Sequence, residues 1–144
     1  MKAKEYLQQV TKLDMMIQNK LIEVEQWKSI ALGTTSRSDG ERVKASGSQQ
    51  KMADAVAKYV DMEKELNLQI DRLAELKQTI ISDIEQLPAN EYDFLHKMYI
   101  QGMELEEVAA IKGKTYSWAT TVHGNALKQL QRMLDERGKE IDAV

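Results

Sequence analysis

A seven-residue hydrophobic repeat in the middle of the chain limits the fold more than any other feature of the sequence. Apolar residues recur every seven positions, at Tyr59, Leu66, Leu73, Ile80 and Leu87. Further apolar residues fill the other seam positions, at Val56, Met62, Ile70, Leu76 and Ile84. Because this spacing places one continuous apolar stripe on a helix, it predicts a single long helix from about Gln50 to Gln86.

The N-terminal segment carries a similar stripe. Apolar residues mostly follow one another at steps of three and four, at Tyr6, Val10, Leu13, Ile17, Val24, Trp27 and Ala31, and Leu7, Met16 and Leu21 widen the stripe. This spacing predicts an amphipathic helix from about Lys2 to Ala31 that ends at Gly33. Glycine, serine and threonine then dominate residues 33–50, which predicts a flexible loop.

Two long helices joined by a loop predict an antiparallel, coiled-coil-like hairpin over residues 1–86. Two helices alone enclose only a narrow core, so part of each apolar stripe is expected to remain exposed. We therefore expect this hairpin to be an oligomerisation region, most simply of a homodimer through the N-terminal helices.

Leu87 and Pro88 mark the predicted boundary, because proline cannot continue the hydrogen-bond ladder of a helix. After it, residues 87–134 are expected to form a small three-helix domain, with Phe94, Leu95 and Met98 pointing inward from its first helix. The charged residues 135–144 are expected to form a frayed tail. The predicted fold class is therefore all-α, a long helical hairpin followed by a small three-helix domain.

The stretch from Gly102 to Leu134 predicts two helices joined by a tight turn. Gly113 can supply the left-handed residue that ends the first helix, and Thr115 can cap the second. The second helix, about 115–133, places an apolar stripe at Ala119, Val122, Ala126, Leu130 and Met133. Its opposite face is small and polar, with Tyr116, Ser117, Thr120, Thr121, Gly124 and Lys128. This arrangement is typical of a helix-turn-helix that places its second helix in the major groove of DNA.

Charge favours DNA binding only in this region. The whole chain has 20 basic and 23 acidic side chains and a net charge of −3, so it is not a strongly basic nucleic-acid binder. Yet no acidic residue lies between Glu107 and Asp135. The basic residues within this gap are Lys112, Lys114, Lys128 and Arg132, together with His123. This local positive charge would attract phosphate at one face.

The same stretch resembles region 4 of the sigma-70 family. The residues that carry the resemblance are Leu87-Pro88, Glu91, Leu95, Tyr99-Ile100, Gly102, Leu105, Glu107-Val108-Ala109, Gly113, Thr115, Ala126-Leu127 and Leu130. The whole layout resembles small phage and prophage proteins of Gram-positive bacteria, grouped with ArpU-type and RinA-type late-gene transcription regulators. The resemblance implies a sequence-specific transcriptional regulator whose partners are double-stranded DNA and, as a further expectation, RNA polymerase.

The resemblance also implies roles for individual residues. Five of them would face base edges or adjacent phosphates, Thr115, Tyr116, Ser117, Thr120 and Thr121. Four would hold phosphates, Lys112, Lys114, Lys128 and Arg132. His123 lies at the edge of this face, where it would bond to phosphate or backbone, and Trp118 is interpreted as a packing residue. The chain departs from the family at Tyr116, Thr120 and Thr121, where sigma-type helices carry basic residues. Nothing in the first 86 residues resembles the segment that melts promoters.

Other functions have less support in the sequence. It contains no glycine-rich phosphate loop, no nucleophile in a recognisable setting and no metal-ligand spacing, so we expect no enzyme activity, metal or cofactor. Cysteine is absent and no apolar run approaches the roughly 20 residues of a membrane span, so we expect an intracellular protein without membrane contact. The resemblance to phage proteins implies that its location is the cytoplasm of a bacterial host cell. Two alternatives remain, a phage DNA-packaging protein resembling a small terminase subunit and an assembly module that binds only protein.

Overall fold

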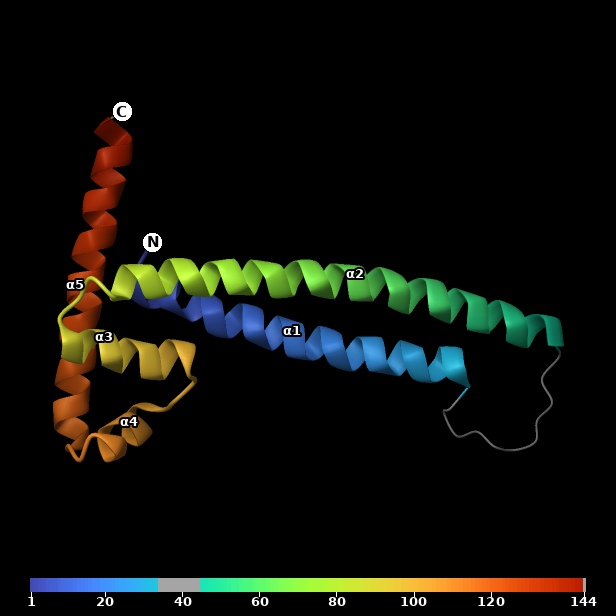
Figure 1. The fold of residues 1–144 in the computed structure, drawn as a ribbon, viewed down its shortest axis with the longest axis horizontal. Helices are drawn as coiled ribbons and strands as arrows, with labels where there is room; N and C mark the ends of the chain where they lie inside the picture. Colours follow the sequence, from blue (N-terminus) through green and yellow to red (C-terminus); the bar gives the residue numbers. More distant parts are fainter. Residues whose placement is uncertain (34–44, 144) are drawn as a thin grey trace. The chain divides into compact units, whose positions relative to one another are not determined.

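The structure, a computed structural model, describes residues 1–33 and 45–143, and within these ranges it contains helices and no strand (Figure 1). The elements are α1 (Ala3–Leu32), α2 (Ala45–Ile84), α3 (Ala89–Leu95), the π-helical segment η1 (His96–Ile100), α4 (Leu105–Ile111) and α5 (Tyr116–Ala143). The predicted all-α class is confirmed. No helix in the described ranges has the length and apolar character that a membrane span requires.

The loop predicted at residues 33–50 is only partly as expected. Gly33 does end the first helix, with the left-handed φ of 68° that favours glycine. However, α2 already begins at Ala45, so the prediction of a loop up to residue 50 is wrong for residues 45–50. Ala45 and the residues that follow it extend the helix of the heptad region toward the N-terminus. The rest of the predicted loop, residues 34–44, lies outside the described residues.

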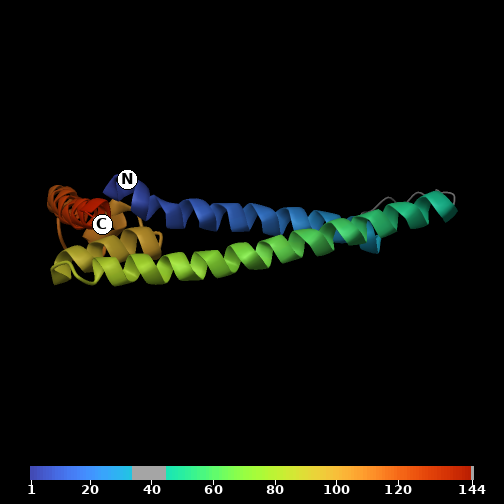
Figure 2. The same cartoon turned by 90° about the horizontal axis from the view of Figure 1, so that it is seen from above.

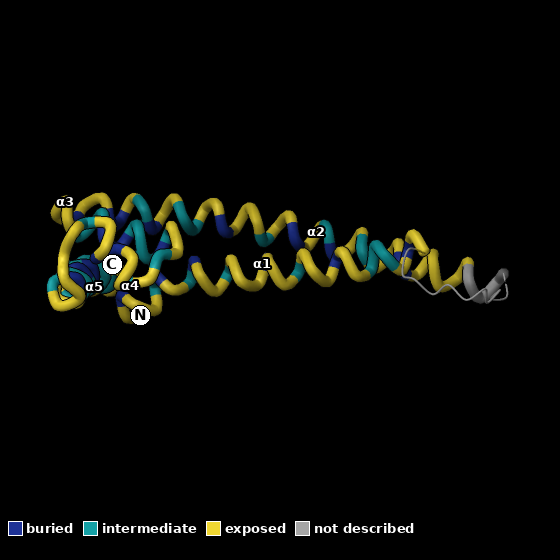
Figure 3. The backbone as a smooth tube through the Cα atoms, turned by 90° about the horizontal axis from the view of Figure 1, so that it is seen from below, coloured by how far each residue is buried: buried dark blue, intermediate teal, exposed yellow. Residues whose placement is uncertain are grey.

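The chain divides into two compact units, and one of them consists of residues 14–72. In this unit the two segments of α1 and α2 run side by side in opposite directions (Figures 1 and 2). Two ion pairs join them, Lys20 Nζ to Glu65 Oε2 at 3.6 Å and Lys28 Nζ to Glu63 Oε2 at 3.3 Å. Buried positions recur along both helices (Figure 3). They include Ile17, Val24, Ala31, Ala55, Met62 and Leu66.

Not every residue of the predicted stripes is buried in this unit. Met16 and Leu21 on α1, and Val56 and Ile70 on α2, are all exposed. Two packed helices cover only the centre of each stripe, so side chains at its edges stay in contact with solvent. The pattern therefore predicts correctly where the helices lie, but it overestimates how much of each stripe the pair buries.

The other compact unit combines residues 1–13 with residues 73–144, of which the structure describes all but the last. Its C-terminal part packs α3 and α4 against α5 (Figure 1). Phe94, Val108, Ala109 and Ala119 form a buried cluster at this junction. Met98, Met103, Leu105, Trp118 and Val122 pack around the cluster. Phe94 and Leu95 are fully buried and Met98 contacts the core, as the sequence predicts.

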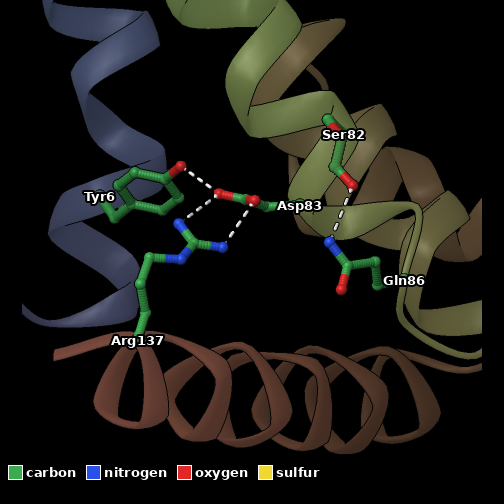
Figure 4. Close-up of polar contacts among 5 residues, drawn as sticks. All are labelled: Tyr6, Ser82, Asp83, Gln86 and Arg137. Atoms are coloured by element: carbon green, nitrogen blue, oxygen red, sulfur yellow. Dashed lines mark hydrogen bonds and ion pairs between the residues drawn. The ribbon is translucent and has the colours of Figure 1, made fainter. Parts of the chain in front are cut away.

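This unit differs from the predicted domain of residues 87–134 in two ways. It includes the first residues of α1 and the last residues of α2, because both of these segments bond to α5. The backbone N–H of Ala3 donates to Gln131 Oε1 at 2.7 Å, and the Arg137 guanidinium pairs with Asp83 (Figure 4). In addition, α5 continues to Ala143, so residues 135–143 are helical and the prediction of a frayed tail there is wrong.

Candidate nucleic-acid interface

A short turn fixes where α5 begins. The backbone N–H groups of Gly113 and Lys114 donate to the carbonyls of Ala110 and Ala109, at 3.1 and 2.9 Å, and close the end of α4. Gly113 has the left-handed φ of 66° that this closure requires. Thr115 Oγ1 then accepts a hydrogen bond from the N–H of Trp118 at 3.0 Å. The predicted role of Gly113 in ending α4 and the predicted capping of α5 by Thr115 are therefore confirmed, and this turn joins α4 to α5.

The first two turns of α5 present hydroxyl groups to solvent. Tyr116 is 59% exposed, and Ser117, Thr120 and Thr121 are exposed as well. The hydroxyls of Thr120 and Thr121 donate to the carbonyls of Tyr116 and Ser117, at 3.0 and 3.1 Å. Each donation fixes the side chain and leaves oxygen lone pairs that can accept from an amino group. The exposed threonine methyl groups can pack on a thymine methyl.

Trp118 lies beside this face but belongs to the core. It is half-buried, and its ring meets that of Phe94 edge-on, with centroids 6.1 Å apart. Lys114 Nζ lies 5.9 Å from the centroid of the Trp118 ring, a cation–π distance. The interpretation of Trp118 as a packing residue is therefore confirmed. Lys114 itself is exposed at the start of the presented face.

His123 lies away from the exposed face, contrary to its predicted place in the DNA contact. Its ring stacks on those of Phe94 and Tyr99, with centroids 6.0 and 5.9 Å away, and its Nε2 is 2.8 Å from the Tyr99 hydroxyl. Burial, and next the positive charge of Lys4, lower the pKa of His123. Ring stacking and the hydrogen bond to Tyr99 explain why this polar residue points inward. We therefore do not include His123 in the proposed interface.

Lys112 is also unsuited to hold phosphate. Its ammonium group forms an ion pair with Asp93 on α3, and Asp93 bonds to Lys97 Nζ as well, at 2.6 Å. Hydrogen bonds from Lys112 and then Lys97 lower the pKa of the Asp93 carboxyl, although burial opposes them. Lys112 therefore ties the turn after α4 to α3. A phosphate contact would have to break this pair, so the structure argues against the predicted role.

Lys128 and Arg132 are exposed further along α5 and make no hydrogen bond or ion pair with any other residue in the described part of the chain. The structure brings Lys2 and Lys4 next to Lys128, in a shallow groove of about 280 Å³ that Ala3, Leu127 and Gln131 complete. The sequence analysis did not place Lys2 and Lys4 near α5, because they lie more than a hundred positions from it. The sequence shows their positive charge but not that the fold brings them next to Lys128.

Within the described ranges, no group of three or more histidine, cysteine, aspartate or glutamate side chains is placed to hold a metal ion. The described residues form an all-α fold in which α5 follows α4 after a short turn and presents exposed hydroxyl and basic groups. Comparison of the chain with protein-family models, with curated proteins and with solved structures found no match.

Proposed function

We propose that this protein is a sequence-specific DNA-binding transcription regulator, not an enzyme, and that α5 enters the major groove. One observation carries the proposal. The first turns of α5 expose Ser117, Thr120 and Thr121, and α5 itself carries no acidic residue before Asp135. A carboxylate there would repel the phosphate backbone, whereas hydroxyl groups can approach both bases and phosphates.

Affinity and specificity come from different residues in this proposal. Lys114, Lys128 and Arg132 are exposed cations that would contact phosphates of any sequence and release bound counterions. Ser117, Thr120 and Thr121 would distinguish base pairs through hydroxyl and methyl contacts. Lys112 and His123 have no role in binding here, because Asp93 and Tyr99 engage them.

The proposal of a phage-type regulator, with RNA polymerase as a second partner, rests on the resemblance to sigma-70 region 4. The helix-turn-helix arrangement of α4 and α5 and the capping of α5 by Thr115 agree with that resemblance. A regulator of this kind would bind beside a promoter through α5. Contact with the polymerase would then recruit it to that promoter or exclude it.

We also propose that the protein forms a homodimer through its two N-terminal helices, α1 and α2. In residues 14–72, apolar side chains stay exposed on α1 and α2, among them Leu21, Ile22, Leu68 and Ile70. Leu21 and Ile22 line a shallow groove of about 290 Å³ on α1. A second copy could cover these side chains, and a dimer would present two α5 helices to two half-sites.

Fluorescence anisotropy with a mixed-sequence DNA duplex, titrated across salt, tests the proposed function. We expect the logarithm of the binding constant to fall linearly with the logarithm of salt, by about 0.9 per phosphate contact. A folded protein that leaves the duplex unbound at low salt would contradict DNA binding. Light scattering of the same sample tests the assembly, since a closed ring of many subunits would favour the packaging alternative over the dimeric regulator.

A further inference from the structure

A second basic surface lies beside α5, formed where the N-terminus of α1 meets it. Gln131 on α5 accepts from the N–H of Ala3 at 2.7 Å and donates to the carbonyl of Met1 at 3.3 Å. These bonds hold residues 1–4 against α5 within one compact unit. Lys2 and Lys4 therefore have fixed backbone positions next to Lys128, and the three side chains line one groove.

The three ammonium groups are not neutralised by the protein. Lys2, Lys4 and Lys128 are exposed, and none of their ammonium groups has a hydrogen-bond or ion-pair partner among the described residues. The nearest acidic residues in the sequence are Glu5 on α1 and Asp135 on α5, and Asp135 accepts a hydrogen bond from Gln131 at 3.0 Å. Lys4 is also close enough to His123 for its charge to act there. Like charges held together in this way favour an anion that bonds to all of them.

We infer that Lys2, Lys4 and Lys128 form one binding site for the sugar-phosphate backbone of the DNA that α5 reads. The inference rests on the proposed function and adds the N-terminus of α1 to its interface. Lysine suits this role, since its ammonium group contacts phosphate as a point charge without selecting a base.

The position of the groove along α5 agrees with this assignment. Lys128 follows Ser117 by eleven residues, which corresponds to about 17 Å along a helix. The major groove is about 12 Å wide, so the lysines would lie beyond its edge, at the sugar-phosphate backbone, when Ser117 faces the bases. The backbone strand runs along that edge. Lys114, in the turn before α5, would contact the opposite strand.

The salt dependence of duplex binding separates this inference from the proposed function. We compare the wild type with the double variant Lys2→Gln/Lys4→Gln, and the matched control is Lys58→Gln/Lys64→Gln. The control lysines are exposed on α2 and make no hydrogen bond or ion pair within the described ranges. All three proteins are measured as the full chain, with the fold checked by circular dichroism.

We expect the double variant to reduce the salt slope by about 1.8, because each lysine that no longer neutralises a phosphate lowers the slope by about 0.9. The control should keep the wild-type slope, and Lys128→Gln should reduce it by about 0.9. A wild type that binds DNA while the Lys2/Lys4 variant keeps the full slope would overturn this inference alone. A wild type that does not bind the duplex would overturn both the inference and the proposed function.

Discussion

Arg137 holds the buried carboxylate of Asp83 at two points, with Nη2 2.9 Å from Oδ1 and Nη1 3.2 Å from Oδ2 (Figure 4). The hydroxyl of Tyr6 donates to the same carboxylate. Burial, and next this hydrogen bond to Asp83, raise the pKa of Tyr6 to about 12. One carboxylate on α2 thus joins α1 and the C-terminal half of α5, so residues after 134 are part of the fold.

Replacing this carboxylate should destabilise the protein. Asp83 is only 6% exposed and accepts bonds from both partners, so Asp83→Ala is expected to lower the free energy of unfolding by about 2 kcal/mol. Urea denaturation at neutral pH measures this loss. The control is Asp71→Ala, at an exposed position on the same helix. Equal stability of the two variants would contradict a structural role for the contact.

The stabilisation by Asp83 should depend on pH. Burial raises the pKa of this carboxyl, but hydrogen bonds from Arg137 and Tyr6 and the charge of Arg137 outweigh burial and lower it. A carboxyl with a lowered folded-state pKa stabilises the protein fully above its unfolded pKa of about 3.9 and progressively less as the pH falls through the folded value. The difference between wild type and Asp83→Ala should therefore shrink below about pH 4. A constant difference through this range would argue against the assignment.

Two glycines in or next to α5 should respond to alanine in opposite directions. Gly113 has a φ of 66°, so Gly113→Ala should destabilise the protein by about 1 kcal/mol through backbone strain. Gly138 lies inside α5 and a Cβ there meets nothing within 4 Å, so Gly138→Ala should stabilise by about 0.5–1 kcal/mol. Thermal unfolding of both variants checks the pair. A gain in stability from Gly113→Ala would contradict the turn geometry.

The sequence predicts the helices and the inward residues because spacing along one helix is local information. The stripe through Ala119, Ala126 and Leu130 is buried as predicted, and Thr115 caps α5 as predicted. It could not predict the partners of charged and polar side chains across the fold. The ion pair of Lys112 with Asp93 and the hydrogen bond of His123 with Tyr99 each join residues from different elements, which only the packed fold brings together. The number of basic residues near a motif therefore overestimates how many of them are free to bind DNA.

Substitutions of Lys112 and Lys114 should have different effects, the first on stability and the second on DNA binding. Because Asp93 engages Lys112, Lys112→Gln is expected to cost up to about 1 kcal/mol of stability and to leave the salt slope of DNA binding unchanged. Lys114 is exposed and has no ion pair within the described ranges, so Lys114→Gln should reduce the slope by about 0.9. Anisotropy and urea denaturation of both variants measure the two effects. A reduced slope for Lys112→Gln and an unchanged slope for Lys114→Gln would instead place Lys112 in the interface and exclude Lys114.

His123 should titrate below its ordinary value. Burial first and the charge of Lys4 second lower its pKa, so the folded protein favours the neutral ring. Stability is therefore complete above the unfolded pKa of about 6.5 and is lost as the pH falls through the folded value. An NMR titration of the ring protons measures the midpoint. His123→Phe should keep the ring stack, lose the bond to Tyr99 and remove this pH dependence. A midpoint above 6.5 would contradict the burial of the ring.

The most direct test of DNA binding by α5 is an NMR titration of the isotope-labelled full chain with a short mixed-sequence duplex. We predict that backbone amide signals shift at residues 114–121 of the turn and α5, and around Gly124, Lys128 and the N-terminus of α1. Signals of residues 14–32 on α1 provide the internal control, since they should not move. Shifts confined to α1 and α2, or no shifts at low salt, would contradict the claim that α5 contacts DNA.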